Sequence, residues 1–240
     1  MTKDVCKPEF DVSFAFQPIV DVDSHKVFAY EALVRGPCNE PAGAVFKSIA
    51  PSQLHAFDRD ARLRAIALAA SLGLSEGLSL NFLPHSLETF PDAISSTLDA
   101  ARAAGIAERR IFLEVTEGEL IRDAAGFAQT INQYRESGVQ LAIDDFGAGH
   151  SGLNLLADFQ PDVIKIDMHL VREIESRGPR QAIARAVIQV CDDLGIEVIA
   201  EGVETELEYR WFKRVGVRLF QGYLFGRPQF ESLSAPAYAG

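Results

Sequence analysis

The sequence predicts an α/β protein, a closed (β/α)8 barrel that opens with an antiparallel hairpin. Three observations lead to this prediction. Strand and helix patterns alternate from end to end, eight β-rich runs fall within 240 residues, and a turn-rich segment separates the first two runs. An open doubly wound sheet is the alternative architecture, because strand count alone does not establish closure.

The first two predicted strands are residues 13–20 and 26–34. Both are dominated by apolar and aromatic residues, which favour extended structure. Between them, residues 21–25 read DVDSH, a sequence typical of a turn. The two strands are therefore expected to form a hairpin and to run antiparallel.

Strand and helix patterns alternate after the hairpin. The six remaining predicted strands are residues 78–81, 111–114, 140–144, 163–165, 197–201 and 217–221. Helical periodicity marks residues 57–72, 92–104, 124–137, 180–194 and 204–215. A glycine that could form a left-handed cap ends each helix, at Gly73, Gly105, Gly138, Gly195 and Gly216. This order predicts right-handed βα units and a mainly parallel sheet.

Composition indicates one globular domain over residues 1–240. Hydrophobic residues make up 48% of the chain, and no Pro/Gly/Ser linker or low-complexity tract divides it. The net charge of -11 argues against a nucleic-acid polymer as partner. Three scattered cysteines predict neither a disulfide framework nor a thiolate zinc site. With no signal-peptide pattern and no membrane-length apolar run, a cytoplasmic location is expected.

Polar residues end most of the predicted strands. In a barrel, the carboxyl ends of parallel strands meet at one face, where active sites lie. The residues in question are Asn81, Glu114, Asp144, Lys165, Glu201 and Gln221. For any single acidic residue, capping of the following helix is an alternative explanation. Glu31 lies within the second strand, and the sequence leaves open whether it faces the core or the solvent.

Carboxylates on separate strands would repel one another in a single pocket unless cations bind there. The residues concerned are Glu31, Glu114, Asp144, Asp145 and Glu201. Oxygen ligands without His or Cys favour Mg²⁺ or Mn²⁺ over zinc. The adjacent Asp144 and Asp145 are suited to bridging two metal ions, which would activate a water and hold a phosphodiester. Lys165 would orient or polarise that water.

An ordered series of motifs resembles the EAL family of cyclic di-GMP phosphodiesterases. Residues 31–35 read EALVR, and residues 113–117, 144–147, 165–167, 201–204 and 221–225 read LEVTE, DDFG, KID, EGVE and QGYLF. The resemblance extends from residue 16 to residue 228 and implies one EAL domain with a core of about residues 12–230. It implies a TIM-like (β/α)8 barrel with an antiparallel first strand, which hydrolyses cyclic di-GMP to linear pGpG with two Mg²⁺ or Mn²⁺ ions.

The resemblance also implies roles for individual residues. One metal ion would be held by Glu31, Asn81, Glu114 and Asp144, and the other by Asp144, Asp145 and Glu201. The implied catalytic residues are Lys165, which positions the water, and Glu201, Glu204 and Gln221. The implied substrate-binding residues are Gln17, Leu33, Arg35, Asn81, Asp145 and Pro228, with Arg35 on a phosphate. A homodimer and a regulatory protein partner are further expectations.

Glu117 resembles the residue that anchors the loop after Asp145, which couples dimer and metal site in this family. Within that loop the sequence departs from the family pattern at Ala148, His150 and Gly152. Relatives that have lost ligands act as cyclic di-GMP receptors or protein-interaction modules. Because no ligand is missing here, hydrolysis is the first hypothesis and a non-catalytic receptor or interaction module is the alternative.

Two expectations concern residues outside the motifs. The mixed charges of residues 58–64 predict a solvent-facing helix surface. Phe82 and Phe225 are the aromatic residues expected to line a base pocket, while the others are assigned to the core.

Overall fold

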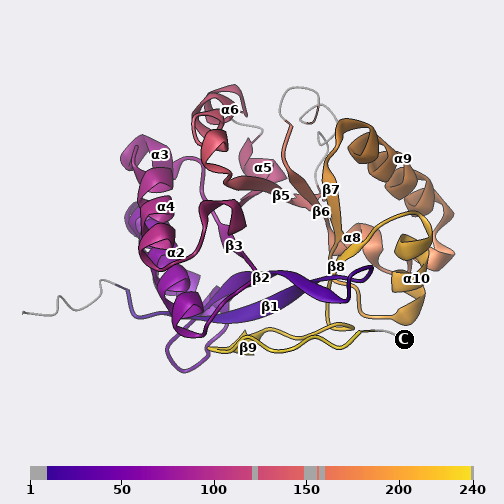
Figure 1. The fold of residues 1–240 in the computed structure, drawn as a ribbon, viewed down its shortest axis with the longest axis horizontal. Coiled ribbons are helices and arrows are strands. Elements are labelled where there is room, and N and C mark those ends of the chain that lie inside the picture. Colours follow the sequence, from indigo (N-terminus) through magenta and orange to yellow (C-terminus); the bar gives the residue numbers. More distant parts are fainter. Residues whose placement is uncertain (1–9, 121–123, 149–155, 157–159, 239–240) are drawn as a thin grey trace, which may run out of the picture.

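The strands form a closed barrel, with helices packed around its outside (Figure 1). The computed structural model describes residues 10–120, 124–148, 156 and 160–238. Its strands are β1 (Ser13–Asp21), β2 (Lys26–Arg35), β3 (Gly77–Asn81), β4 (Ile111–Thr116), β5 (Gln140–Phe146), β6 (Val163–Ile166), β7 (Glu197–Ala200), β8 (Leu219–Gln221) and β9 (Gln229–Phe230).

The pairing of β1 closes the barrel. Strands β2 to β8 are parallel and lie in sequence order, whereas β1 pairs antiparallel with β8 on one side and with β2 on the other. This topology confirms the predicted barrel with an antiparallel first strand and rules out the open sheet. The short β9, which the sequence did not predict, extends the edge of β1 by pairing Phe16 with Gln229.

The opening hairpin forms as predicted. Its register runs from Ser13 opposite Arg35 to Asp21 opposite Lys26, with an irregularity between Ile19 and Val20. In the turn, the Asp21 carboxylate accepts hydrogen bonds from the backbone N–H groups of Asp23 at 2.9 Å and Ser24 at 3.2 Å. Such local bonds from aspartate favour a turn over continued strand.

The longer helices lie outside the strand ring (Figure 1). The described helices are α1 (Ala42–Ser48), α2 (Leu54–Ser71), α3 (Ser86–Thr89), α4 (Ala93–Ala103), α5 (Glu117–Leu120), α6 (Ala124–Asn132), α8 (Met168–Val171), α9 (Gly178–Leu194) and α10 (Glu206–Arg214). All five predicted helices are present, although the segment 124–137 divides into α6 and a 3-10 turn at Arg135–Ser137. The sequence did not predict α1, which has seven residues, or α3, α5 and α8, which have four each; all are too short to show a clear helical period.

Glycine ends α9 in the way that the sequence predicts. Gly195 has φ 71°, and its N–H donates to the carbonyls of the last helical turn. This left-handed conformation is costly for other residues, so glycine sets the point at which the helix stops and the chain enters β7.

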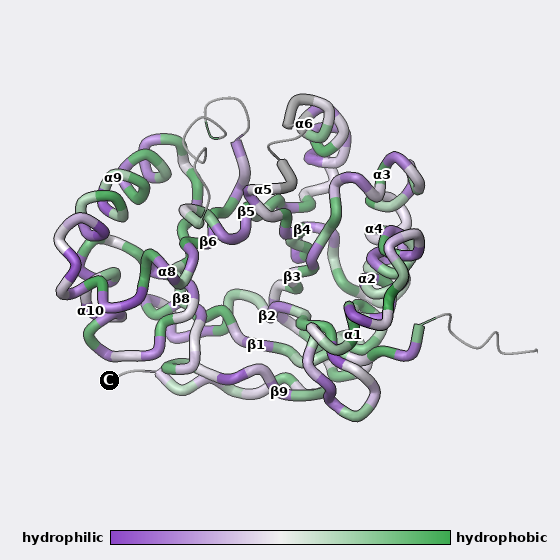
Figure 2. The backbone as a smooth tube through the Cα atoms, turned by 180° about the vertical axis from the view of Figure 1, so that it is seen from behind, coloured by the Kyte–Doolittle hydropathy of each residue, from purple (hydrophilic) through white to green (hydrophobic). Residues whose placement is uncertain are grey.

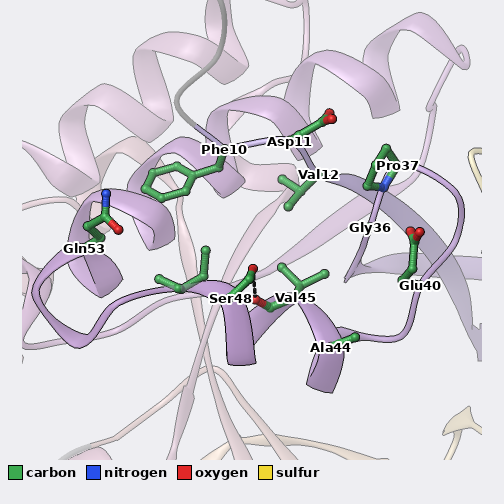
Figure 3. Close-up of a pocket in the computed structure, with 11 residues that line it drawn as sticks. Phe10, Asp11, Val12, Gly36, Pro37, Glu40, Ala44, Val45, Ser48 and Gln53 are labelled. Atoms are coloured by element: carbon green, nitrogen blue, oxygen red, sulfur yellow. Dashed lines mark hydrogen bonds between the residues drawn. The ribbon is translucent and has the colours of Figure 1, made fainter.

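Two apolar layers support the barrel. One fills its interior and takes residues from seven strands: Ile19, Ala29, Phe112, Ala142, Val163, Ile199 and Leu219. A larger layer packs the outer strand faces against the helices. Figure 2 shows hydrophobic stretches along the strands and alternating hydrophobic and hydrophilic segments along α9. Because the interior layer excludes water from the barrel, ligands have access only at its ends.

Two of the sequence expectations are wrong. Asp58 and Arg62, within the segment expected to face solvent, are 8% and 2% exposed. Phe82 and Phe225 are each 1% exposed and pack in the main core, not in a base pocket. In both cases the neighbouring apolar residues pack against the barrel and bury these side chains with them.

Candidate functional site

Lys165 on β6 is the centre of a buried ionic cluster at the carboxyl ends of the strands. Its Nζ lies 2.7 Å from Glu201 Oε1, 2.9 Å from Glu114 Oε1, 3.2 Å from Asp144 Oδ1 and 3.5 Å from Glu31 Oε2. These carboxylates come from β2, β4, β5 and the residue after β7. We call these five residues the acidic ring. Lys165 is 1% exposed, so its charge is compensated by these carboxylates and not by water.

The charges in the acidic ring perturb one another strongly. Burial raises the pKa of Glu114 to about 8 and that of Glu201 well above its usual value, although Lys165 opposes both shifts. Burial also disfavours ionisation of Asp144, but the charge of Lys165 and the hydrogen bonds with Lys165, Glu201 and the Asp145 N–H together lower the Asp144 pKa. The carboxylates in turn raise the pKa of Lys165 well above its usual value, against the effect of burial. One ammonium thus faces four carboxyl groups, an arrangement that favours further cations.

Hydrogen bonds fix two of the ring carboxylates. Ser79 Oγ donates to Glu114 Oε1 at 2.5 Å, and Gln221 Nε2 donates to Glu31 Oε2 at 2.6 Å. In the part of the chain that the structure describes, the buried Glu114 Oε2 and Gln221 Oε1 have no hydrogen-bond partner. Buried acceptors without donors are costly, and a bound cation or water would satisfy them.

Asp144, Asp145 and Glu201 bring their carboxylate oxygens within 4.8 Å of one another. Successive residues of a regular strand point to opposite faces, but Asp145 has φ 56° and the β5 register is irregular here. This conformation lets both aspartates approach Glu201. Burial, followed by the charges of Asp144 and Asp167, raises the pKa of Asp145 to about 6.

The donors fit hard divalent cations. One group is Asp144, Asp145 and Glu201. In the other, Glu31, Glu114 and Asp144 converge on Lys165, while Asn81 lines the same cavity as Glu31 and Asp144. All of these side chains offer oxygen, the ligand type that Mg²⁺ and Mn²⁺ prefer. The residues therefore match both predicted metal sets in chemistry, and their roles as ligands remain a prediction.

Two cavities adjoin the acidic ring, and Glu31 and Asp144 line both. The smaller has a volume of about 260 Å³ and a polar wall that includes Lys165 and Glu201. The larger, about 550 Å³, has a mainly apolar wall that includes Leu33. The acidic ring is thus bordered by one cavity with many charged residues and one that is mainly apolar.

A profile of the EAL domain family matches residues 9–228. This chain belongs to the EAL domain family. The match covers the barrel and every residue of the acidic ring, so the predicted family resemblance is confirmed.

The chain spans about half the length of two curated relatives from Escherichia coli (strain K12). It is 36% identical over 232 residues to the blue light- and temperature-regulated antirepressor BluF, covering 96% of this chain and 58% of BluF. It is 32% identical over 226 residues to the probable cyclic di-GMP phosphodiesterase PdeN, covering 89% of this chain and 43% of PdeN.

Two solved structures are very similar to this one. The manganese and cyclic di-GMP complex of Klebsiella pneumoniae BlrP1 at pH 9.0 has a TM-score of 0.91 and 43% identity, covering 97% of this chain and 60% of BlrP1. The cyclic di-GMP-bound form of a standalone EAL protein from Vibrio cholerae O395 has a TM-score of 0.90 and 44% identity, covering 96% of this chain and 98% of that one.

None of the helices that the structure describes combines the length and the apolar character that a membrane span requires.

Three residues predicted to act at the site are not part of the acidic ring. Neither Arg35 nor Pro228 lines one of the two described cavities, and Arg35 Nη1 instead donates to the carbonyl of Val34 at 2.8 Å. Glu204 lines the smaller cavity, yet it pairs with Arg172 rather than with Lys165. Any part that Glu204 takes in catalysis would therefore involve its contact with Arg172 and not a contact with the acidic ring.

Gln17 and Glu117 hold neighbouring segments of this EAL domain. Gln17 Nε2 donates to the Gly226 carbonyl at 3.0 Å and Gln17 Oε1 accepts from Gln221 Nε2 at 3.3 Å, so Gln17 supports the chain before Pro228.

Glu117 Oε2 accepts from the Gly147 N–H at 3.2 Å, close after the Asp144–Asp145 pair. This contact agrees with the predicted anchoring role. His150 and Gly152 lie outside the described residues, whereas Ala148 is exposed.

Sequence reasoning missed the buried pair of Asp58 and Arg62 on α2. Both line the larger cavity, where Arg62 Nη1 contacts Asp58 and the Asn81 carbonyl at 3.4 Å, and Nε donates to Thr97 at 3.2 Å. The guanidinium also lies 4.4 Å from the centroid of the Phe82 ring. The i, i+4 spacing places the two residues on one helix face, and the apolar neighbours Ala65 and Ile66 were the available signal for burial.

Proposed function

We propose that this EAL domain is a metal-dependent phosphodiesterase that hydrolyses cyclic di-GMP to linear pGpG in bacterial second-messenger signalling. The observation that carries the proposal is the acidic ring, in which Lys165 contacts four carboxylates at one end of the barrel. The manganese and cyclic di-GMP complex of the similar BlrP1 supports the choice of ligand.

The proposed reaction adds one water to one phosphodiester. The water oxygen forms a bond to phosphorus, the bond to the ribose 3′ oxygen breaks, and that oxygen receives a proton. Glu31, Asn81, Glu114 and Asp144 would hold one Mg²⁺ or Mn²⁺, and Asp144, Asp145 and Glu201 the other. When bound, the two cations would lower the pKa of the water and offset charge on the phosphate.

The protein side chains would arrange this chemistry. Lys165 would orient the water, since its ammonium lies among the carboxylates that would bind the cations. Gln221 holds the Glu31 carboxylate, and Gln17 holds Gln221. Leu33 and the apolar wall of the larger cavity would take a base, with Arg35, Asp145 and Pro228 as further substrate contacts. Glu204 would contribute to catalysis by positioning Arg172, with which it pairs at the wall of the smaller cavity.

The proposal also covers the domain, the oligomeric state and the partners of the protein. We expect residues 1–240 to form a single domain that dimerises, with Glu117 linking the loop after Asp145 to the dimer contact. A regulatory protein partner is also part of the proposal.

A second candidate is a module that binds cyclic di-GMP or a protein without hydrolysis. The observation in its favour is the similarity to BluF, an antirepressor by name. Retained binding of cyclic di-GMP without product in saturating Mg²⁺ would support this alternative.

The deciding experiment is chromatography of cyclic di-GMP incubated with the purified protein in Mg²⁺, Mn²⁺ or EDTA. We expect linear pGpG with either metal ion and none with EDTA. Glu31→Ala and Asp144→Ala should abolish the product while circular dichroism shows an intact fold. Glu136→Gln, at an exposed carboxylate outside the ring, is the matched control. Unchanged hydrolysis by Glu31→Ala would sink the proposal.

A further inference from the structure

The smaller cavity beside the acidic ring contains one accessible cation. Among the described residues that line it, the cationic side chains are those of Lys165 and Arg172. Lys165 is 1% exposed and its ammonium is shared among the ring carboxylates. The Arg172 side chain, which follows α8, is 27% exposed. Among the described residues that line this cavity, Arg172 is therefore the cation that an anion can reach, beside the carboxylates of the same wall.

Two carboxylates of different character hold Arg172. Glu208 Oε1 lies 3.5 Å from Arg172 Nη1, and the Glu208 side chain is 3% exposed. Backbone N–H groups of Glu204, Thr205 and Glu173 donate to Glu208 at 2.9, 3.0 and 3.2 Å, so this partner is fixed. Glu204 accepts from Arg172 Nη2 but is 44% exposed at the cavity wall. It is therefore the partner that a ligand can replace.

Guanidinium chemistry determines what can replace Glu204. The planar fork presents several N–H donors and binds phosphate oxygens in pairs, so one edge can keep Glu208 while the other exchanges a carboxylate for a phosphate. A phosphomonoester carries about -1.5 to -2 charges at neutral pH, more than a carboxylate does. Exchange is therefore favoured for a terminal phosphate.

We propose that Arg172 binds the phosphate group that the reaction releases as a monoester, with Glu204 as the carboxylate it displaces. Asp144, Asp145 and Glu201 line the same cavity, which places the hydrolysed phosphate within this space. This inference rests on the proposed function, because the terminal phosphate belongs to the linear product. It assigns Glu204 the role of a competitor for Arg172.

The test measures binding of linear pGpG and of GpG, which lacks the terminal phosphate, by calorimetry in EDTA. We expect the unmodified protein to bind pGpG about tenfold more tightly than GpG, as for one charge-assisted hydrogen bond. Arg172→Met should remove this preference and Arg172→Lys should retain part of it. Glu204→Gln should tighten pGpG binding several-fold, and millimolar inorganic phosphate should compete with pGpG only where Arg172 is present.

The matched control is Arg210→Met, because Arg210 forms a surface pair with Glu206 at 2.8 Å and does not line the described cavity. An unchanged pGpG preference in a folded Arg172→Met variant, or weaker pGpG binding by Glu204→Gln, would overturn the inference. Hydrolysis in Mg²⁺ is measured separately. An Arg172-dependent preference without hydrolysis supports the phosphate site and rejects the enzyme, whereas hydrolysis with an Arg172-independent preference rejects the phosphate site alone.

Discussion

Gln221 Nε2 donates to Glu31 Oε2 at 2.6 Å, which joins two residues 190 positions apart in the chain. Gln221 ends β8 and Glu31 lies within β2, so the bond links the two strands that flank the closing strand β1. Without this donor, a 7% exposed carboxylate of the acidic ring would lose its orientation.

We expect Gln221→Met to slow cyclic di-GMP hydrolysis about tenfold to a hundredfold, because a displaced Glu31 would misplace the cation that it is proposed to hold. Methionine is similar in volume, so the fold should persist. The measurement is steady-state kinetics with Mn²⁺, with Gln189→Met on the exposed surface of α9 as control. Full activity of Gln221→Met would show that Glu31 needs no support from Gln221.

Lys165→Met should destabilise the protein in EDTA by about 3–5 kcal/mol, the usual cost of removing one partner from a buried ionic cluster. Four carboxylates would then lack a compensating charge. Added Mn²⁺ should raise the melting temperature of this variant more than that of the unmodified protein, as thermal unfolding would measure. Lys213→Met, at a surface pair with Asp23, is the control. Equal responses to Mn²⁺ would contradict the prediction.

Arg62→Met should cost about 3–5 kcal/mol of unfolding free energy, because Asp58 would remain buried without its guanidinium partner. Burial already raises the Asp58 pKa against the influence of Arg62. In the double variant Asp58→Asn with Arg62→Met no charge remains, so urea denaturation should show part of the loss recovered. The idea fails if the double variant is as unstable as the sum of the two single changes.

Glu208→Gln should lower stability by about 1 kcal/mol at pH 7, since it weakens the capping of α10. Burial opposes ionisation of Glu208, but the N–H groups of Glu204, Thr205 and Glu173 lower its pKa below the ordinary 4.5. Because the pKa of Glu208 is lower in the folded state, its ionised carboxylate stabilises the protein above about pH 4.5. This stabilisation is lost as the pH falls through the folded-state pKa. Urea denaturation from pH 7 to pH 3 should therefore show the two proteins converging in acid. A difference that is constant with pH would exclude a charge effect.

Much of the fold follows from local patterns. The hairpin, the eight barrel strands and five main helices are visible in runs of apolar residues, turn formers and glycines. The short α1, α3, α5 and α8 and the two-residue β9 are not, because segments of seven residues or fewer show no clear period and form only when the rest of the fold supports them.

The site divides in the same way. Polar residues at successive strand ends predicted that Glu114, Asp144 and Glu201 would meet near Lys165, and all three contact it. The sequence left open whether Glu31 would join them, and the structure places it 3.5 Å from Lys165. The contact of Glu204 with Arg172 was not predictable, because it joins segments that follow different strands. Motif spacing predicts which residue types lie near the site, but it does not predict which partners the long side chains contact.

By itself, the sequence determined the alternation of strands and helices, the family and the set of oxygen donors. Only the tertiary structure decided that β1 closes the ring, that Glu31 faces inward to Gln221, and that Asp58 and Arg62 are buried together. The reason is physical. Local patterns set backbone conformation within a few residues, whereas burial and pairing of charges depend on which distant strands the closed barrel brings side by side.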